Sequence, residues 1–359
     1  MSISRIILIV TVCFLISTLM VPIVKKIAYH IGALDIPDAR KVHTTPMPRL
    51  GGLAIFTAFL LGYMLFATPT TEMNSILIGS FIVFLTGMLD DIKPLPASIK
   101  FGGQLLGALT VVFYGGIVID KINIFSATFN LSDFAILNYG ITLFLILGCM
   151  NCINLIDGLD GLSSGVASIF FITIGIIGYI QGTMSGLDIT LAFIMLGATL
   201  GFLLHNFHPA KIFMGDSGTL FVGFIIGVIA ILGFKNVTVT SLITPLLILA
   251  IPIMDTLFAI IRRLLKGQPI SKPDKFHIHH QLLNLKISHV GTVLIIYLIN
   301  ILFALSSIIY VLKDEALGRI VYAIILIIVI WFVSNTSVVV DTDNIKHKLS
   351  ELSEKKHKK

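Results

Sequence analysis

Long apolar runs separated by short polar connections dominate this sequence, and they predict its architecture. A run of about 20 apolar residues is long enough to cross the ~30 Å hydrocarbon core of a bilayer as an α-helix. Such runs cover residues 3-24, 50-68, 75-89, 101-119, 135-153, 163-181, 188-205, 217-234, 240-261, 290-312 and 317-337. The third run is short enough for a tilted or partly interfacial helix. The pattern therefore predicts an all-α polytopic membrane protein with about 11 transmembrane helices.

The ends of the pattern define the expected domain. Pro22 and the basic pair Lys25-Lys26 follow the first run without a small-residue cleavage site, so we expect a retained helix and not a signal peptide. No repeat or long linker interrupts residues 1-338, which are expected to form a single transmembrane domain. Residues 339-359 form a basic tail. One long connection, residues 119-134, has room for a hairpin, and its weak alternation favours a short strand.

The composition and the distribution of charge refine this picture. Apolar residues make up 56% of the 359 residues and charged residues only 12%, against roughly a quarter charged in an average soluble protein. Of the 25 lysines and arginines, 20 fall in the tail and in loops 25-49, 90-100, 206-216 and 262-289. The positive-inside rule makes these parts cytoplasmic, so the N-terminus lies outside and the C-terminus in the cytoplasm. Contact with anionic lipid explains the net charge of +6, and no nucleic-acid partner is needed.

Polar residues that membranes normally exclude lie beside these cytoplasmic loops. They are Asp90, Asp91, Asn154, Asp157, Asp160, Asn206, His208, Asp216, His277, His279 and His280. Any one of them can be a solvated loop residue. A cluster over five successive loops, however, predicts a functional site at the cytoplasmic face, because ionisable groups at the ends of membrane helices are costly unless solvated or paired.

Two of the motifs contain oxygen ligands of the kind that Mg²⁺ prefers. The adjacent carboxylates Asp90 and Asp91 repel each other and favour a nearby cation, with a solvated helix end beside Lys93 as the alternative. A second motif recurs every three residues, at Asn151, Asn154, Asp157 and Asp160. On a helix this spacing makes one slanting polar stripe, which suits either a magnesium site or a transport pathway.

The motif around Asp216 predicts a site for metal-bound diphosphate. Gly215 and Gly218 flank Asp216 at the start of an apolar run, where Ser217 can cap the helix. A helix N-terminus attracts phosphate, and Asp216 would attract the accompanying metal. Phe213 offers a flat surface for a base, although aromatic residues are also common at membrane interfaces.

The most basic loops would complete such a site. Residues 277-280 contain three histidines, which can bind zinc, transfer protons, hydrogen-bond phosphate or simply be solvated. No cysteine lies nearby and the carboxylates favour a hard cation, so zinc is not expected. In loop 25-49, Arg40, Lys41 and Arg49 are placed to meet anions.

Taken in order, these motifs match a known family. They are Arg40-Lys41-Val42-His43, Asp90-Asp91, Asn154-Leu155-Ile156-Asp157-Gly158-Leu159-Asp160-Gly161, Asn206 with Pro209-Ala210, Phe213-Met214-Gly215-Asp216 and His277-Ile278-His279-His280. From about residue 20 to 335 the chain resembles the polyprenyl-phosphate N-acetylhexosamine-1-phosphate transferases of glycosyltransferase family 4. The histidine motif and the Arg-Lys-Val-His segment favour the branch that transfers GlcNAc-1-phosphate over the branch that transfers phospho-muramoyl-pentapeptide.

The resemblance implies a Mg²⁺-dependent enzyme of the cell membrane, with Mn²⁺ as an alternative metal. UDP-GlcNAc would donate GlcNAc-1-phosphate to undecaprenyl phosphate and leave UMP. That reaction would initiate a surface polysaccharide such as wall teichoic acid, and the resemblance is compatible with a homodimer. Alternatives are another UDP-sugar donor, a lipid-diphosphate hydrolase with water as the acceptor, and a membrane carrier.

The resemblance also assigns roles. The catalytic residues would be Asp90, Asp91 and Asp216, and the metal ligands Asp216, Asn154 and Asp91. Substrate-binding residues would be Lys41, Asp157, Asp160, Asn206, Phe213, Arg263, His277, His279 and His280.

Overall fold

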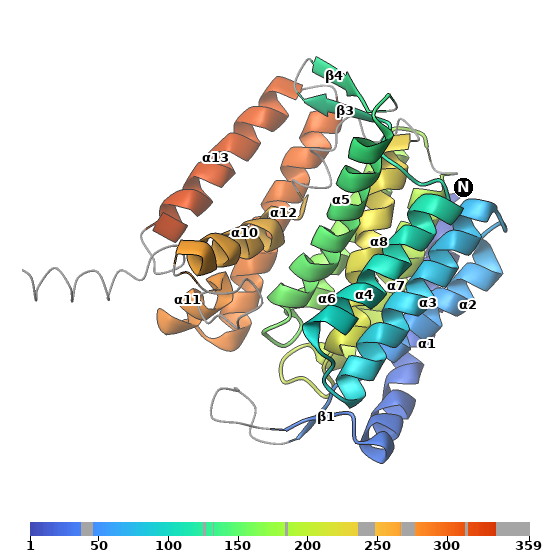
Figure 1. Cartoon of the computed structure of the whole chain (residues 1–359). Coiled ribbons are helices and arrows are strands. Elements are labelled where there is room, and N and C mark those ends of the chain that lie inside the picture. Colours follow the sequence, from blue (N-terminus) through green and yellow to red (C-terminus); the bar gives the residue numbers. More distant parts are fainter. Residues whose placement is uncertain are drawn as a thin grey trace, which may run out of the picture.

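Nearly all regular structure in this protein is helical (Figure 1). The computed structural model describes residues 1–36, 46–124, 127–131, 133–183, 186–235, 248–265, 267, 277–312 and 315–334. Its longer helices are α1 (Ile3–Ile31), α2 (Gly52–Phe66), α3 (Thr71–Ile92), α4 (Ala97–Leu109), α5 (Ala135–Ile156), α6 (Leu162–Ile180), α7 (Leu187–Asn206), α8 (Gly215–Lys235), α10 (Ala250–Leu265), α12 (His289–Val311) and α13 (Glu315–Ser334). The short helix α11 is Ile278–Asn284, and α4 continues into a π-helical segment, Thr110–Tyr114.

Two short antiparallel hairpins complete the fold. Strand β1 (Leu34–Asp35) pairs with β2 (Met47–Pro48), and β3 (Lys121–Ile124) pairs with β4 (Ala127–Asn130). In the second hairpin Lys121 lies opposite Asn130. The hairpin and the short strand expected in the connection 119-134 are therefore confirmed.

The predicted class, an all-α polytopic membrane protein, is confirmed. Within the described residues, 8 helices are long and apolar enough to cross a membrane: α1, α3, α4 with its π-helical segment, α5, α6, α7, α8 and α12. Helix α2 and the stretch Ala316–Phe332 of α13 are apolar but shorter. Each predicted run overlaps a helix, whereas the number that cross the membrane and the orientation stay predictions.

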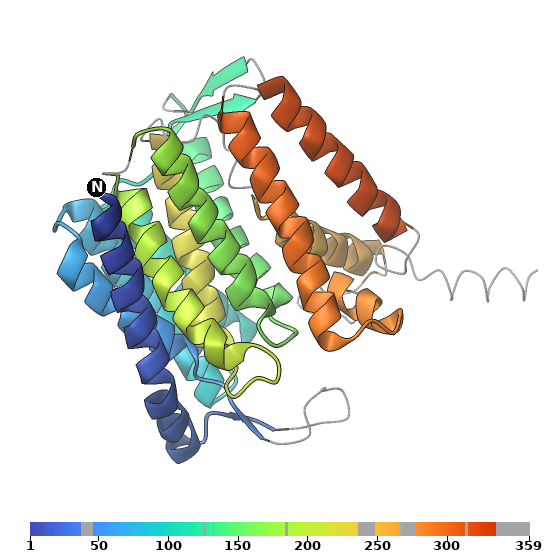
Figure 2. The same ribbon diagram turned by 180° about the vertical axis from the view of Figure 1, so that it is seen from behind.

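Three predicted spans differ from the helices. Helix α1 continues past the expected end at residue 24 to Ile31. The third span was predicted to be short, but α3 has 22 residues, because Thr70 caps its start and the two aspartates at its end belong to the helix. Residues 236–247 lie outside the described part, and the helix that follows, α10, crosses the bundle at a steep angle in both views (Figures 1 and 2).

Helix α8 occupies the centre of the bundle. Of its apolar stretch Gly215–Gly233, 94% is buried, and it packs against α2, α3, α5 and α7. Close aromatic contacts fix this packing, since the Phe56 ring stacks on Phe84 with centroids 4.3 Å apart and meets Phe221 edge-on at 5.2 Å. The start of α8 is thus held rigidly among its neighbours.

The two ends of the bundle differ in character. The β3–β4 hairpin and the N-terminus lie at one end, and β1, α11 and the connection after α7 lie towards the other (Figures 1 and 2). The described polar motifs lie towards this second end, and those around Asp91, Asn154 and Asp216 meet at the start of α8. The functional site expected there stays a prediction.

Candidate active site

A carboxylate from α3 holds the start of α8. Asp91 Oδ1 accepts a hydrogen bond from the Asp216 backbone N–H (2.8 Å), and Oδ2 accepts from the Ser217 N–H (3.0 Å) and Ser217 Oγ (2.6 Å). Arg49 Nε lies 3.2 Å from Asp91 Oδ1, and the Asp91 side chain is fully buried. Asp91 therefore caps α8. The expectation that Ser217 caps the helix is wrong, and two of the N–H groups expected to bind phosphate are already used.

The loop before α8 makes this contact possible. Gly215 has a φ of 70°, and a Cβ there would lie 2.5 Å from Asp91 Oδ2 and 2.6 Å from the Arg49 carbonyl oxygen. Phe213 N–H donates to the Pro48 carbonyl (2.8 Å), and Gly51 N–H donates to the Phe213 carbonyl (3.0 Å). These hydrogen bonds tie the segment after β2 to the loop before α8 and place Arg49 beside both aspartates.

Asp216 faces a mixed set of polar groups. Asn154 Nδ2 donates to Asp216 Oδ1 (3.1 Å) and to Thr219 Oγ1 (2.8 Å). Arg49 Nη2 lies 3.6 Å from Asp216 Oδ1, and the Lys100 ammonium contacts Asp216 Oδ2. Lys100 Nζ also lies 3.6 Å from Asp90 Oδ2. Two cations thus balance a pair of partly buried carboxylates at the end of an apolar bundle.

This set of groups fits a hard divalent cation. The Asp216 side chain is only 13% exposed, and its Oδ2 is held against the Lys100 ammonium, so this oxygen already stabilises a cation. Carboxylate and carboxamide oxygens are the ligands that Mg²⁺ prefers. Asn154 would offer Oδ1 after a turn of its amide, since its nitrogen now faces Asp216.

The predicted polar stripe on α5 is interrupted. The helix ends at Ile156, so Asp157 and Asp160 lie in the following turn. Asn151 Nδ2 donates to Gln104 Oε1 (2.9 Å) on α4, whereas Asn154 points to α8. A transport pathway along one face of α5 would require these side chains to line up. Their divergence favours a compact site at the helix end.

Asp157 begins this turn and lies near Asp91. Ser163 Oγ donates to Asp157 Oδ1. Burial raises the pKa of the Asp157 carboxyl from 3.8 to about 6, although the hydrogen bond from Ser163 opposes this, and the nearby Asp91 charge adds to the rise. Asp157 is therefore a titratable group of the site.

The raised pKa predicts how stability changes with pH. Between pH 3.8 and about 6 the folded protein retains a proton on Asp157 that the unfolded chain has lost, so stability falls as pH rises through this window. As the pH rises through this window, the free energy of unfolding of wild type should fall by roughly 1–3 kcal/mol relative to that of Asp157→Asn. Melting temperatures of both proteins in detergent and EDTA from pH 4 to 7 would measure it. Melting temperatures of the two proteins that change by the same amount across this pH range would contradict the raised pKa of Asp157.

A second set of contacts fastens the loop after α7 to the same turn. Asp160 Oδ2 lies 2.7 Å from His208 Nδ1 and accepts from the Ala210 N–H (3.1 Å), while the Asp160 N–H donates to His289 Nε2 (3.0 Å). The ligand atoms of Asp160, His208 and His289 all lie within 4.8 Å of one another, close enough for a metal site. Since these atoms already bond to one another or to the backbone, we interpret the group as a hydrogen-bonded clamp.

Asn206 reinforces the clamp. Its Oδ1 accepts from the Gly161 N–H (3.1 Å) and from Ser164 Oγ (2.8 Å), and its Nδ2 donates to the Ile212 carbonyl (3.0 Å). The side chain is buried. The structure thus shows Asn206 joining two loops, and its predicted contact with substrate stays a prediction.

His279 of α11 packs beside the same turn. A Cβ on Gly158 would lie 2.4 Å from His279 Nε2, so the glycine allows the imidazole to approach closely. His277 and His279 are buried, with parallel rings 5.6 Å apart. Burial lowers the pKa of His279 well below its usual range, and the neighbouring imidazoles of His280 and His277 lower it further. His279 is therefore a neutral imidazole at neutral pH.

Most of the predicted site residues thus meet at one end of the bundle. Phe213 is half-buried and Arg263 lies buried on α10, but Lys41, Arg40 and His43 fall outside the described residues, as does the tail. Sequence reasoning missed Lys100, Asp255 and His289. For Asp255 a signal was available, because a carboxylate inside a predicted membrane span is costly and is therefore a functional candidate.

Comparisons with known proteins identify the family of this chain. A sequence model of glycosyl transferase family 4 matches residues 73–234. The chain is 44% identical to a probable undecaprenyl-phosphate N-acetylglucosaminyl 1-phosphate transferase of Bacillus subtilis, over 89% of each chain. It is 32% identical to a decaprenyl-phosphate N-acetylglucosaminephosphotransferase of Mycobacterium tuberculosis, over 84% of this chain and 82% of the relative. An undecaprenyl-phosphate alpha-N-acetylglucosaminyl 1-phosphate transferase of Haemophilus influenzae is 33% identical, over 75% and 77%.

Proposed function

This chain belongs to glycosyl transferase family 4, and we propose that it transfers GlcNAc-1-phosphate from UDP-GlcNAc to undecaprenyl phosphate. The products are undecaprenyl-diphospho-GlcNAc and UMP, so the reaction starts a lipid-linked glycan. The observation that carries the proposal is the meeting of Asp90, Asp216 and Asn154 with Arg49 and Lys100 at one end of an apolar bundle.

The position of the site suits substrates from two phases. The polyprenyl chain dissolves in the bilayer, whereas the nucleotide sugar is dissolved in water, so the reacting groups have to meet at the membrane surface. The polar end of the bundle offers such a surface. The basic residues of loops 25-49 and 262-289 support the proposal that this end faces the cytoplasm.

Asp216 and Asn154 would hold Mg²⁺, with Asp90 beside them. When bound, the ion would neutralise the charge of the diphosphate and polarise the phosphorus that is attacked. Asp91 was predicted from the resemblance to be a third ligand. Its oxygens already accept three hydrogen bonds and pair with Arg49, which supports a role in positioning Asp216 instead.

The chemistry requires little from the protein beyond positioning and charge. An oxygen of the lipid phosphate forms a bond to the β-phosphorus of UDP-GlcNAc. The bond from that phosphorus to the oxygen bridging to the α-phosphorus breaks, and UMP leaves with this oxygen. Lys100 and Arg49, held against the carboxylates, would stabilise the negative charge on the phosphoryl oxygens.

Asp90 is the candidate organiser at the acceptor. Its Oδ1 accepts from the Leu95 N–H (2.8 Å), which fixes the carboxylate, and its Oδ2 faces Lys100. A phosphate monoester is already largely ionised near neutral pH, so Asp90 need not act as a strong base. We propose that it orients Lys100 towards the lipid phosphate. The nucleotide and sugar would bind beside the turn that carries Asp157 and Asp160, against which His279 packs.

The proposal is tested with purified protein in detergent, undecaprenyl phosphate and Mg²⁺. UDP-GlcNAc, UDP-GalNAc and UDP-MurNAc-pentapeptide are compared as donors, and UMP and the lipid product are both measured. We expect lipid-linked GlcNAc with UDP-GlcNAc, loss of activity in EDTA and recovery with Mg²⁺. UMP without lipid product would indicate a hydrolase. Folded protein that is inactive with every donor would overturn the proposal.

A further inference from the structure

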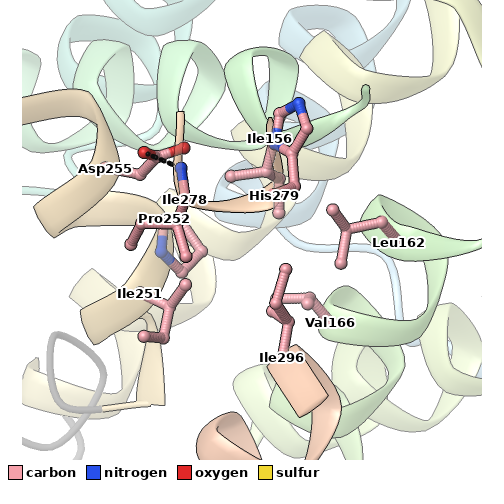
Figure 3. A pocket seen from close by; sticks show the side chains of 9 residues that line it. All are labelled: Ile156, Leu162, Val166, Ile251, Pro252, Asp255, Ile278, His279 and Ile296. Atoms are coloured by element: carbon pink, nitrogen blue, oxygen red, sulfur yellow. Dashed lines mark hydrogen bonds between the residues drawn. The ribbon is translucent and has the colours of Figure 1, made fainter. Parts of the chain in front are cut away.

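A carboxylate of α10 anchors the start of α11. Asp255 is 2% exposed, and its Oδ1 accepts a hydrogen bond from the Ile278 backbone N–H (2.9 Å). Its Oδ2 lies 2.9 Å from Nδ1 of His277, which is itself buried. Figure 3 shows the carboxylate turned towards the backbone of Ile278. One side chain thus fixes both the first turn of α11 and the imidazole that precedes it.

The side chains around Asp255 are mostly apolar, so burying its carboxylate there is energetically unfavourable. A small cavity beside the carboxylate is lined mainly by apolar side chains, which are Ile156, Leu162, Val166, Ile251, Pro252, Ile278 and Ile296 (Figure 3). A carboxylate buried among such groups is destabilising unless its oxygens are hydrogen-bonded. Within the described residues, the Ile278 N–H and the His277 imidazole are the hydrogen-bond partners of the two Asp255 oxygens. The pair therefore specifies one arrangement of α11 against α10.

The hydrogen bond also decides where the imidazole carries its proton. An ionised carboxylate only accepts hydrogen bonds, so Nδ1 of His277 is the donor. A neutral His277 then carries its proton on Nδ1 and leaves Nε2 free to accept a hydrogen bond or a proton. A carboxylate that orients an imidazole in this way is a common support for metal-binding and catalytic histidines.

His277 in turn lies next to the candidate active site. Its ring is parallel to His279, whose Nε2 packs against Gly158 in the turn after α5. That turn also carries Asp157 and follows Asn154, the partner of Asp216. A shift of α11 would therefore move the turn that carries Asp157, and with it Asn154 and its contact with Asp216.

We propose that Asp255 is a positioning residue of the transfer reaction, acting by holding His277 in its Nδ1–H form and α11 against the turn after α5. This role rests on the proposed function. Asp255 makes no contact with substrate in this scheme. Its effect is exerted through His277 and through the position of α11, and Asp255→Asn, which can keep the hydrogen bond from Ile278, isolates the part exerted through His277.

The first test is a double-mutant comparison. In Asp255→Asn the carboxamide can still accept from the Ile278 N–H, but its nitrogen then faces His277 Nδ1 and forces the proton to Nε2. We expect kcat to fall by about 10- to 100-fold while KM for UDP-GlcNAc changes by less than about threefold. If Asp255 acts through His277, the double variant Asp255→Asn/His277→Ala loses no more than His277→Ala alone. Losses that multiply, or an Asp255→Asn variant with wild-type kcat, would overturn the proposal.

The matched control changes the neighbouring residue of α10. Thr256 Oγ1 donates to the Pro252 carbonyl (2.8 Å), so Thr256→Val perturbs the same helix without touching the Asp255–His277 pair. This variant should keep its kcat within about twofold, since a surviving fold leaves His277 in place. A comparable loss in Thr256→Val would show that α10 is merely sensitive to substitution.

A second measurement does not depend on activity. Nitrogen-15 NMR of wild-type protein labelled at histidine reports the tautomer of each ring, and His277→Gln identifies the signal of His277. We expect the Nδ1–H form in wild type and the Nε2–H form in Asp255→Asn. An Nε2–H form in wild type would overturn the proposal even with full transferase activity. An Nδ1–H form in a wild type that makes no lipid-linked sugar would refute the proposed function but preserve the pairing.

Discussion

Replacing Asp216 by Asn is expected to lower kcat for GlcNAc-1-phosphate transfer by at least about 10³-fold, which corresponds to roughly 4 kcal/mol of transition-state stabilisation. Asp216 is a largely buried carboxylate that lies between Asn154, Arg49 and Lys100, and its Oδ2 contacts the Lys100 ammonium. The substitution removes the charge that would hold Mg²⁺ and leaves Lys100 without one of its two carboxylate partners. Initial rates of UMP release over a range of Mg²⁺ concentrations would measure the loss.

The control for this substitution is an aspartate far from the site. Asp133 is exposed in the connection between β4 and α5, at the opposite end of the bundle, so Asp133→Asn should retain wild-type rates. Asp216→Asn should also keep the start of α8 in place, because the backbone N–H of Asp216, and not its side chain, bonds to Asp91. An Asp216→Asn enzyme with more than a tenth of wild-type activity would refute the assignment of Asp216 as the main ligand.

Replacing Asp91 by Ala is expected to destabilise the folded protein by about 3–5 kcal/mol, the range for breaking a buried ion pair. The substitution removes the acceptor of two backbone N–H groups at the start of α8 and of the Ser217 hydroxyl, and it leaves Arg49 without this partner. Because α8 is the most buried helix of the candidate spans, its displacement is felt throughout the bundle. Reversible unfolding in mixed detergent, followed by circular dichroism, would measure the loss.

Ser217→Ala provides the graded control, since it removes a single hydrogen bond and should cost about 1 kcal/mol. Activity of the surviving Asp91 variants discriminates between two roles. A positioning Asp91 predicts a Mg²⁺ requirement like that of wild type. A stable Asp91→Ala enzyme that needs much more Mg²⁺ would instead show that Asp91 is a metal ligand, as the family resemblance suggested.

The two adjacent aspartates therefore differ in environment although they look alike in sequence. Asp91 points into α8 and is fully buried, whereas Asp90 Oδ2 faces Lys100 with its side chain 12% exposed. Successive helical residues project about 100° apart, so one of two neighbours faces the core and the other the site. Which of them does so depends on the rotation of α3, and this rotation is set by packing.

The sequence alone determined the membrane class, the approximate helices, the hairpin after α4 and the collection of polar motifs at one end. These features follow from local properties, because a run of apolar residues must become a helix to satisfy its backbone in lipid. Several polar residues in that collection were also identified correctly as neighbours. Asn154 and Asp216, for example, do meet at 3.1 Å.

Only the tertiary structure decided what each polar group does. Asp91 and the N–H of Asp216 are 125 residues apart in the chain, Asp160 and His289 are 129 apart, and Asp255 meets His277 from a helix that crosses the bundle. The end of α5 at Ile156 likewise separated side chains that an unbroken helix would have aligned. Such pairings depend on how the helices are rotated and on where each one stops. Both properties result from packing summed over the whole bundle, and residue spacing within any single segment does not contain them.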